Sequence, residues 1–178
     1  MISRKTLSGI LLSVALSSCA APEYTPAATD MARIRVFHGT SVYLYLDGHC
    51  SKDSNQRIHA AAGGHSYFVP NKRIGMPPTA DMPFSYHEYA IPADRPVGIS
   101  MYWAADDKKT GTRFRCGPVM RYFSPKAGHD YDTRIEFLKQ GGCEVHLREL
   151  AMTDSGIATA RALPYESIPV DLKCLEDE

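Results

Sequence analysis

The sequence lacks the short motifs by which many enzymes are recognised. It contains no Gly-rich phosphate loop, no G-x-S-x-G nucleophile elbow and no C-x-x-C pair. It also lacks an excess of charge, because 20 basic residues balance 20 acidic residues, which argues against a strongly basic surface for nucleic acid. The 178 residues, 44% of them hydrophobic, suffice for one globular domain with a sizeable core. We therefore expect a folded domain without catalytic activity, cofactor or nucleic-acid partner.

A hydrophobic run long enough to span a membrane is also missing near the N-terminus. The apolar stretch from Leu7 to Leu16 has about ten residues, whereas a spanning helix needs about 20. It follows two basic residues, Arg4 and Lys5, as the central region of a secretory signal peptide does. Residues 1–18 are therefore predicted to be a signal peptide and not a permanent anchor.

The segment Leu16-Ser17-Ser18-Cys19 resembles the lipobox of bacterial lipoproteins. The resemblance implies that the chain is cleaved before Cys19 and that Cys19 carries acyl chains. Each buried CH₂ group contributes roughly 0.8 kcal/mol, so several chains anchor a protein stably. Ala20, where that family has Asp in inner-membrane members, implies the outer membrane, on its periplasmic face. The alternative is a secreted protein whose signal happens to contain a cysteine.

Residues 19–30 follow as the expected lipidated N-terminus and flexible tether, because they are small residues with two prolines and no apolar periodicity. Residues 31–178 are the expected domain with its C-terminal tail. The membrane, reached through the lipid, and an envelope protein are the partners that this organisation predicts.

Four cysteines remain in the mature chain: Cys50, Cys116, Cys143 and Cys174. An even number of cysteines in an exported chain favours two disulfides. If residues 116–123, 129–138 and 143–150 form two successive hairpins, Cys116 and Cys143 lie on strands on either side of one central strand. Their separation would be about 9–10 Å, beyond the limit of about 7 Å between the Cα atoms of a disulfide. We therefore expect Cys50–Cys116 with Cys143–Cys174, or as the alternative Cys50–Cys143 with Cys116–Cys174.

The mature chain reads as a series of short strands. The clearest alternation is in residues 129–138, where Tyr131, Thr133, Ile135 and Phe137 alternate with Asp130, Asp132, Arg134 and Glu136. This period of two predicts one buried face and one face in water. Further strands are expected at 33–37, 41–46, 65–69, 85–91, 97–103, 112–123 and 143–150. Residues 71–83 read as a Pro-rich loop, and 151–162 is the one segment compatible with a helical turn. The predicted fold is all-β: a single, disulfide-stapled antiparallel β-sandwich of about 7–8 strands.

A short run supports this fold by resemblance. Phe123, Pro125, Ala127, Gly128 and Tyr131 form an F-x-P-x-A-G-x-x-Y pattern that is similar to the strand–turn–strand ending of transthyretin-like and immunoglobulin-like bacterial envelope domains. The similarity covers about ten residues and implies a β-sandwich.

The candidate partner surface comprises the 71–83 loop and two tyrosines. Lys72, Arg73, Met76 and Met82 give the loop exposed cationic and apolar groups, and long loops on rigid sandwiches commonly carry function. The competing interpretation is a tolerated insertion. Tyr43 and Tyr45 share one strand face, where they either contact a partner or pack under other elements.

The histidines and carboxylates leave two other function classes open. His87-Glu88 lacks the second histidine of a zinc protease, because Ile91 occupies that position. Carboxylate pairs such as Asp130 and Asp132 are interpreted as part of a solvated strand face. We expect a non-catalytic interaction or assembly module and no metal site. The alternatives are a periplasmic ligand- or metal-binding lipoprotein and a periplasmic hydrolase. A metal site would need three or more of the histidines to lie close to one point, and the candidates are His38, His49, His59, His65, His87, His129 and His146.

Overall fold

The structure, a computed structural model, describes residues 28–46, 57–63, 70–83, 85–107, 109–138 and 142–164. The signal peptide, Cys19, most of the tether, Cys50, Cys174 and the expected strand at 65–69 lie outside these residues. The predictions made for them therefore stay predictions.

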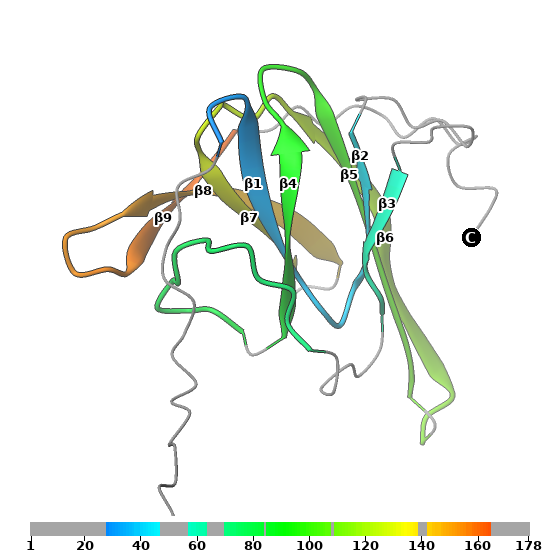
Figure 1. The fold of residues 1–178 in the computed structure, drawn as a ribbon. Coiled ribbons are helices and arrows are strands. Elements are labelled where there is room, and N and C mark those ends of the chain that lie inside the picture. The colour runs from blue at the N-terminus through cyan, green and yellow to red at the C-terminus, as the bar shows by residue number, and fades with distance from the viewer. Residues whose placement is uncertain are drawn as a thin grey trace, which may run out of the picture.

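Two β-sheets pack face to face (Figure 1). The five-stranded sheet has the order β4-β1-β7-β8-β9, and the four-stranded sheet has the order β3-β2-β5-β6. The strands are β1 (Met31–Phe37), β2 (Ser41–Tyr45), β3 (Arg57–Ala61), β4 (Tyr86–Pro92), β5 (Val97–Asp107), β6 (Thr112–Phe123), β7 (Asp130–Phe137), β8 (Cys143–Met152) and β9 (Ala158–Ala162).

The all-β sandwich predicted from the alternation is confirmed, with three differences in detail. The described residues contain nine strands, of which β3 and β9 were not expected. The pair β1–β7 is parallel, whereas the other strand pairs are antiparallel. Residues 151–162 form the end of a hairpin and not a helical turn. The chain turns after Met152, with Gly156 at a φ of +78°, and returns as β9.

The main core lies between the two sheets. Alternate residues of the facing strands supply it, as the period of two requires. Ile34, Val42, Leu44, Ile99 and Leu147 are among its fully buried members. The inner faces of both sheets are therefore apolar, as predicted.

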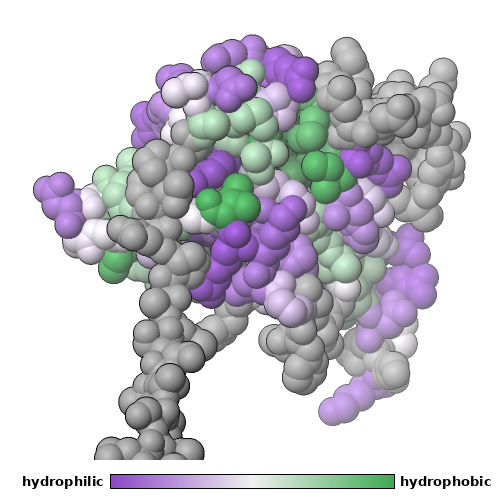
Figure 2. All heavy atoms as spheres, in the orientation of Figure 1, coloured by the Kyte–Doolittle hydropathy of each residue, from purple (hydrophilic) through white to green (hydrophobic). Residues whose placement is uncertain are grey.

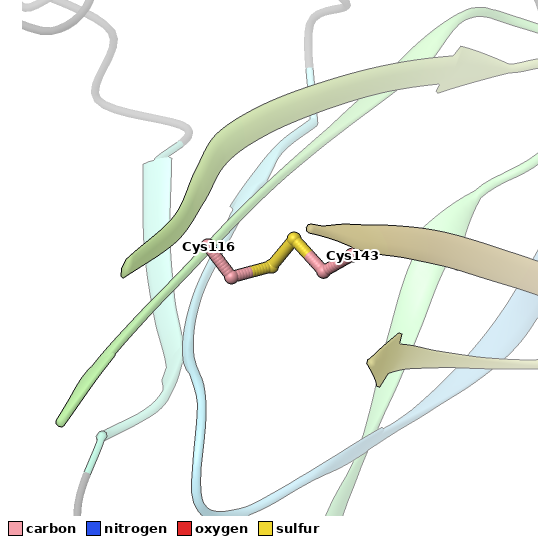
Figure 3. Close-up of a disulfide and its surroundings, with 2 residues drawn as sticks. All are labelled: Cys116 and Cys143. Carbon is pink, nitrogen blue, oxygen red and sulfur yellow. A yellow bond between two sulfur atoms is a disulfide. The ribbon is translucent and has the colours of Figure 1, made fainter. Parts of the chain in front are cut away.

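The disulfide prediction was wrong, because Cys116 and Cys143 are joined (Figure 3). Their Cα atoms are 5.8 Å apart. The prediction placed β6 and β7 in one sheet as a hairpin, but β6 belongs to the four-stranded sheet and β7 and β8 to the five-stranded sheet. The two cysteines therefore face each other across the sandwich, so Cys116 is not bonded to Cys50 and Cys143 is not bonded to Cys174.

A β-bulge in β6 turns Cys116 toward the other sheet. Met101 pairs with Val119, but Trp103 pairs with Cys116, so β6 contains one extra residue between these pairs. Gly117 occupies the bulge with a φ of +86°, and a Cβ atom there would lie 2.5 Å from the carbonyl oxygen of Met101. Without the extra residue, the alternation would direct the Cys116 side chain away from Cys143.

The turn after β6 carries the chain to the other sheet. Gly128 donates a backbone hydrogen bond to Met31 at the start of β1, and Asp94 donates one to Pro125. The backbone N–H of Lys126 also donates to the Tyr131 hydroxyl at 2.9 Å. These contacts place β7 next to β1, where it pairs in parallel and not with β6. The 123–131 segment therefore connects the two sheets and does not form a hairpin.

Candidate functional site

The outer face of the five-stranded sheet carries a row of four alternating charges, of which three are buried and Arg148 is half-buried. Glu88 of β4, Arg35 of β1, Asp132 of β7 and Arg148 of β8 are consecutive cross-strand neighbours in the register. Arg35 binds Glu88 through Nη2 at 2.7 Å and Nε at 3.1 Å. Arg148 binds both oxygens of Asp132 at 2.7 and 2.5 Å. Opposite charges on adjacent strands stabilise the pairing, and bidentate arginine–carboxylate contacts are the strongest of this kind.

A second buried ion pair lies beside this row. Arg33 of β1 contacts both carboxylate oxygens of Asp130 in β7, at 2.6 and 2.8 Å, and each side chain is only 4% exposed. Burial raises the pKa of Asp130, and the hydrogen bond from Arg33 acts in the opposite direction. The prediction that Asp130 and Asp132 lie on a solvated face was therefore wrong. Both are buried, and so are the two arginines of β1.

The loop predicted at 71–83 covers the outer face of the five-stranded sheet. We call residues 70–83 the strap. Its first half bridges to β4, where Lys72 lies opposite His87, and its second half bridges to β9, where Thr79 lies opposite Ala158. Because β4 and β9 are the two edges of the five-stranded sheet, the strap crosses the whole outer face (Figure 1).

The buried charges hold the strap by its backbone. Arg33 Nη1 donates to the carbonyl oxygens of Ile74 and Gly75, both at 3.3 Å, and Arg35 Nη2 donates to that of Pro77 at 3.0 Å. Glu88 Oε2 accepts the N–H of Ile74 at 2.7 Å. Backbone groups that lose water on burial are thereby paired with side chains. The strap is thus integral to the packing of this face.

Asp81 fastens the second half of the strap. Its carboxylate accepts from Arg148 at 2.8 Å and from Arg134 at 3.0 Å, and both arginines also contact Asp132. The hydrogen bond from Arg148 is the main reason why the pKa of Asp81 lies well below its ordinary value. Two arginines and two aspartates therefore form one network between strap and sheet.

A small apolar cluster lies under the strap, separate from the main core. Met76 of the strap packs with Leu150 of β8 and Ala158 of β9, and Ile74 packs against them. The strap is therefore held by apolar burial as well as by charge.

A pocket of about 200 Å³ opens between the strap and the sheet. Arg35 and Tyr86 form its floor on the sheet side, and Arg73, Met76 and Met82 belong to the strap. Arg35 is 1% exposed, and its Nη1 is buried without a hydrogen-bond partner in the described part of the chain. Leaving such a donor unpaired costs roughly 1–3 kcal/mol. Figure 2 shows a hydrophilic patch with a small hydrophobic group beside it on this face of the molecule.

The strap face, which we define as residues 70–83 with the outer sheet face that they cover, carries more positive than negative charge. Four basic and four acidic side chains form ion pairs here, either within the sheet or between the sheet and Asp81 of the strap: Arg33, Arg35, Arg134 and Arg148 with Asp81, Glu88, Asp130 and Asp132. Lys72 and Arg73 remain, and neither has an ion-pair partner within the described ranges. They lie over aromatic rings instead, with Lys72 Nζ 4.4 Å from the Tyr89 centroid and Arg73 Cζ 5.6 Å from the Tyr86 centroid. The strap face is therefore cationic.

Four of the candidate partner residues belong to the strap, and they differ in exposure. Lys72 and Arg73 are exposed, and Met82 is half-buried. Met76 is buried, which corrects the expectation that it is exposed.

The two tyrosines lie apart from the strap, in β2 of the four-stranded sheet. Tyr45 is 4% exposed, so for it the packing alternative holds. Tyr43 is half-buried, with its ring stacked on His59 at 4.7 Å and Arg57 Cζ 4.1 Å from its centroid. The tyrosines therefore do not contribute to the strap face.

A second pocket, of about 430 Å³, lies at the end of the sandwich next to the β1–β2 turn. Phe37, His38, Trp103, Arg134 and Phe137 are among its walls, and the Trp103 and Phe137 rings meet edge to face at 4.6 Å. His38 packs against His87 at 4.3 Å, and burial together with His87 lowers the pKa of His38.

The other described histidines lie in separate places. His129 contacts Glu149, and His146 contacts Glu136 and Glu144. Within the part of the chain that the structure describes, no three histidine, cysteine or acidic side chains converge on a common metal position.

The sequence interpretation missed the buried charges that position the strap. A signal was present, because residues 33 and 35 are both arginine and residues 130 and 132 are both aspartate, each pair on one face of a strand. Complementary pairs of this kind predict neighbouring strands as well as a solvated face. The charges alone did not indicate what covers them.

No protein-family model, curated protein or solved structure matches the chain. Among the described residues, no helix is long and apolar enough to cross a membrane.

Proposed function

We propose that this protein is a lipid-anchored bacterial envelope protein and that its β-sandwich is a non-catalytic interaction or assembly module. Lipidation at Cys19 holds it at the periplasmic face of the outer membrane, and the strap face binds an envelope protein. The observation that carries the binding role is the pair of exposed cations, Lys72 and Arg73, on a loop fixed rigidly to the sheet and without an ion-pair partner among the described residues. Surfaces with fixed geometry and uncompensated charge favour oppositely charged partners.

The cysteines support export. Disulfide bonds such as Cys116–Cys143 form and persist mainly in the oxidising compartments outside the cytoplasm. With these two joined, Cys50 and Cys174 are the cysteines left to pair in the mature chain. Peptide mapping of the unreduced protein from cells should recover one peptide pair for each bond.

Lipid attachment is tested by metabolic labelling with a clickable fatty acid. Wild-type protein should be labelled and should fractionate with the outer membrane, whereas Cys19→Ala should be unlabelled. An unlabelled wild-type protein would refute the anchor and leave the secreted alternative.

Partner binding is tested by photo-crosslinking in cells from an amino acid introduced at Lys72. We expect one protein to be crosslinked reproducibly from this position and not from Lys109, an exposed lysine at the β5–β6 turn. Charge reversal by Arg73→Glu should abolish the crosslink in a folded protein. A crosslink that survives this reversal would show that the strap charge is not used.

The second pocket favours one alternative, a ligand-binding lipoprotein. Its walls combine aromatic side chains with the polar groups of His38 and Arg134, as small-molecule sites do. A hydrophobic dye that binds there should quench Trp103, the single tryptophan, in a saturable manner.

A further inference from the structure

We propose that the pocket between the strap and the five-stranded sheet binds a carboxylate group on a short apolar body, with Arg73 and Arg35 as its cationic partners. This inference rests on the proposed binding role of the strap face and names the chemistry that the face recognises.

Two observations identify the charged part of the ligand. Arg35 Nη1 is a buried donor that no described residue pairs with, on a side chain that lines the pocket. Arg73 lines the same pocket from the opposite side, and no carboxylate within the described ranges pairs with it. Both guanidinium groups lie near the Tyr86 ring, with Cζ at 5.0 Å for Arg35 and 5.6 Å for Arg73. An anion between them would pair with both and reduce their mutual repulsion.

The charge of the pocket selects a monoanion. Arg35 and Arg73 contribute two positive charges and Glu88 one negative charge, which leaves an excess of one. The oxygens of Glu88 are already occupied, Oε1 by Arg35 and Oε2 by the Ile74 and Met76 N–H groups. A carboxylate therefore neutralises the pocket, whereas a phosphate dianion would leave it negatively charged.

The remaining walls indicate the apolar body. Three apolar side chains of the strap, Met76, Met82 and Pro78, line the pocket. Its volume of about 200 Å³ is below the range of roughly 300–1,000 Å³ that is usual for drug-sized ligands. Methionine side chains are unbranched and adapt easily, so Met82 can move to let a ligand reach Arg35. The ligand is therefore small: a free short-chain acid or an acidic side chain of a peptide.

The two methionines of the strap provide a local measurement. In the full chain in detergent, labelled with methionine carrying ¹³C at the methyl group, butanoate should shift the Met76 and Met82 signals in a saturable manner. The Met101 and Met152 signals, in the core and at the end of β8, should not change. Butanamide, which has the same body without the charge, should cause no saturable shift, and inorganic phosphate should bind more weakly than butanoate.

The matched variants are Arg73→Ala and Arg95→Ala, because both arginines are exposed and Arg95 lies in the β4–β5 turn away from the pocket. Arg73→Ala should raise the dissociation constant for butanoate about tenfold or more, since charge-assisted hydrogen bonds are lost. Arg73→Lys should retain part of the affinity, and Arg95→Ala should leave it unchanged. An unchanged Met101 signal shows that each variant is folded.

A pair of blocked tripeptides, Ala-Glu-Ala and Ala-Gln-Ala, identifies the source of the carboxylate. Binding of the Glu peptide but not the Gln peptide supports an acidic side chain as ligand, and binding of butanoate alone supports a free acid. If neither butanoate nor the Glu peptide shifts the strap methionines, or if Arg95→Ala weakens binding as much as Arg73→Ala, the inference is overturned. Binding of butanoate without any crosslinked protein would refute the proposed partner and leave the pocket intact.

Discussion

The inner and outer faces of the five-stranded sheet are both buried, but different forces make their burial stable. The inner face, with Ile34 and Leu147, meets the other sheet through apolar contacts that depend on matching volume. The outer face, with Arg35 and Glu88, meets the strap through charges that are stable only while each keeps its partner. The same alternation of residues thus gives an inner face whose stability depends on how well apolar side chains fill the space and an outer face whose stability depends on the pairing of charges. Four predictions test this difference, from the largest expected effect to the smallest.

Breaking the Arg35–Glu88 pair should have the largest effect. Arg35→Met removes the cation and leaves Glu88 buried without a partner of opposite charge, which should lower the free energy of unfolding by about 3–5 kcal/mol. Urea unfolding monitored by circular dichroism measures this loss.

The control is the double variant Arg35→Met with Glu88→Gln, which removes both charges and keeps side chains that fill the space. It should be more stable than Arg35→Met alone, since no unpaired charge is buried. If the double variant is less stable than the single variant, the outer face does not depend on charge pairing.

Removing the disulfide on the inner side should have the next effect. Replacing Cys116 and Cys143 by serine should lower the free energy of unfolding by about 3 kcal/mol, because the bond closes a loop with a sequence separation of 27 residues. Reduction of a variant with serine at Cys50 and Cys174 provides the comparison, because Cys116 and Cys143 are then its paired cysteines. An equal loss of stability on reduction and on substitution assigns the effect to this bond.

Loosening the exposed end of the strap should have a smaller, local effect. Asp81→Asn should lower global stability by less than about 1 kcal/mol, because the side chain is half exposed, yet it should speed proteolysis within the strap. The pKa of this carboxyl is lowered on folding, so its contribution is complete above the unfolded value and is lost only as the pH falls through the folded value. Asp154→Asn, in the exposed β8–β9 turn, is the matched control. Cleavage at the wild-type rate in Asp81→Asn would mean that Asp81 does not hold the strap.

The smallest predicted effect concerns the pH dependence that His38 contributes. Burial lowers its pKa, so the unfolded chain takes up a proton at a higher pH than the folded protein does. Stability should therefore fall as the pH drops below the unfolded value of about 6.5. The decrease in melting temperature between pH 7.5 and 5.5 should be smaller in His38→Gln than in the wild type. Equal decreases would contradict a role for this histidine.

The alternation in residues 129–138 was sufficient to predict a strand and the side of the sheet on which each residue lies. It was not sufficient to predict that Asp130 and Asp132 are buried, because that depends on a loop some 50 residues earlier in the chain. Lys72 and Arg73 were recognised as surface candidates from composition alone. The pocket beside them could not be, because Arg35 and Tyr86 come from two different strands.

The disulfide, too, could be predicted from the sequence only in part. The number of cysteines correctly indicated disulfide bonding, but the pairing depended on which sheet β6 joins and on the bulge at Gly117. A sandwich strand pairs equally well with several neighbours as far as its own residues are concerned, because backbone hydrogen bonds are the same for each.

The amino-acid order by itself determined most of the strands, their two faces and the all-β class, since these follow from interactions between residues a few positions apart. The tertiary structure decided which strands are neighbours, which cysteines meet and what covers the charged face. These depend on contacts between segments distant in the chain, where many arrangements satisfy the local pattern and only the packing of the whole molecule selects one.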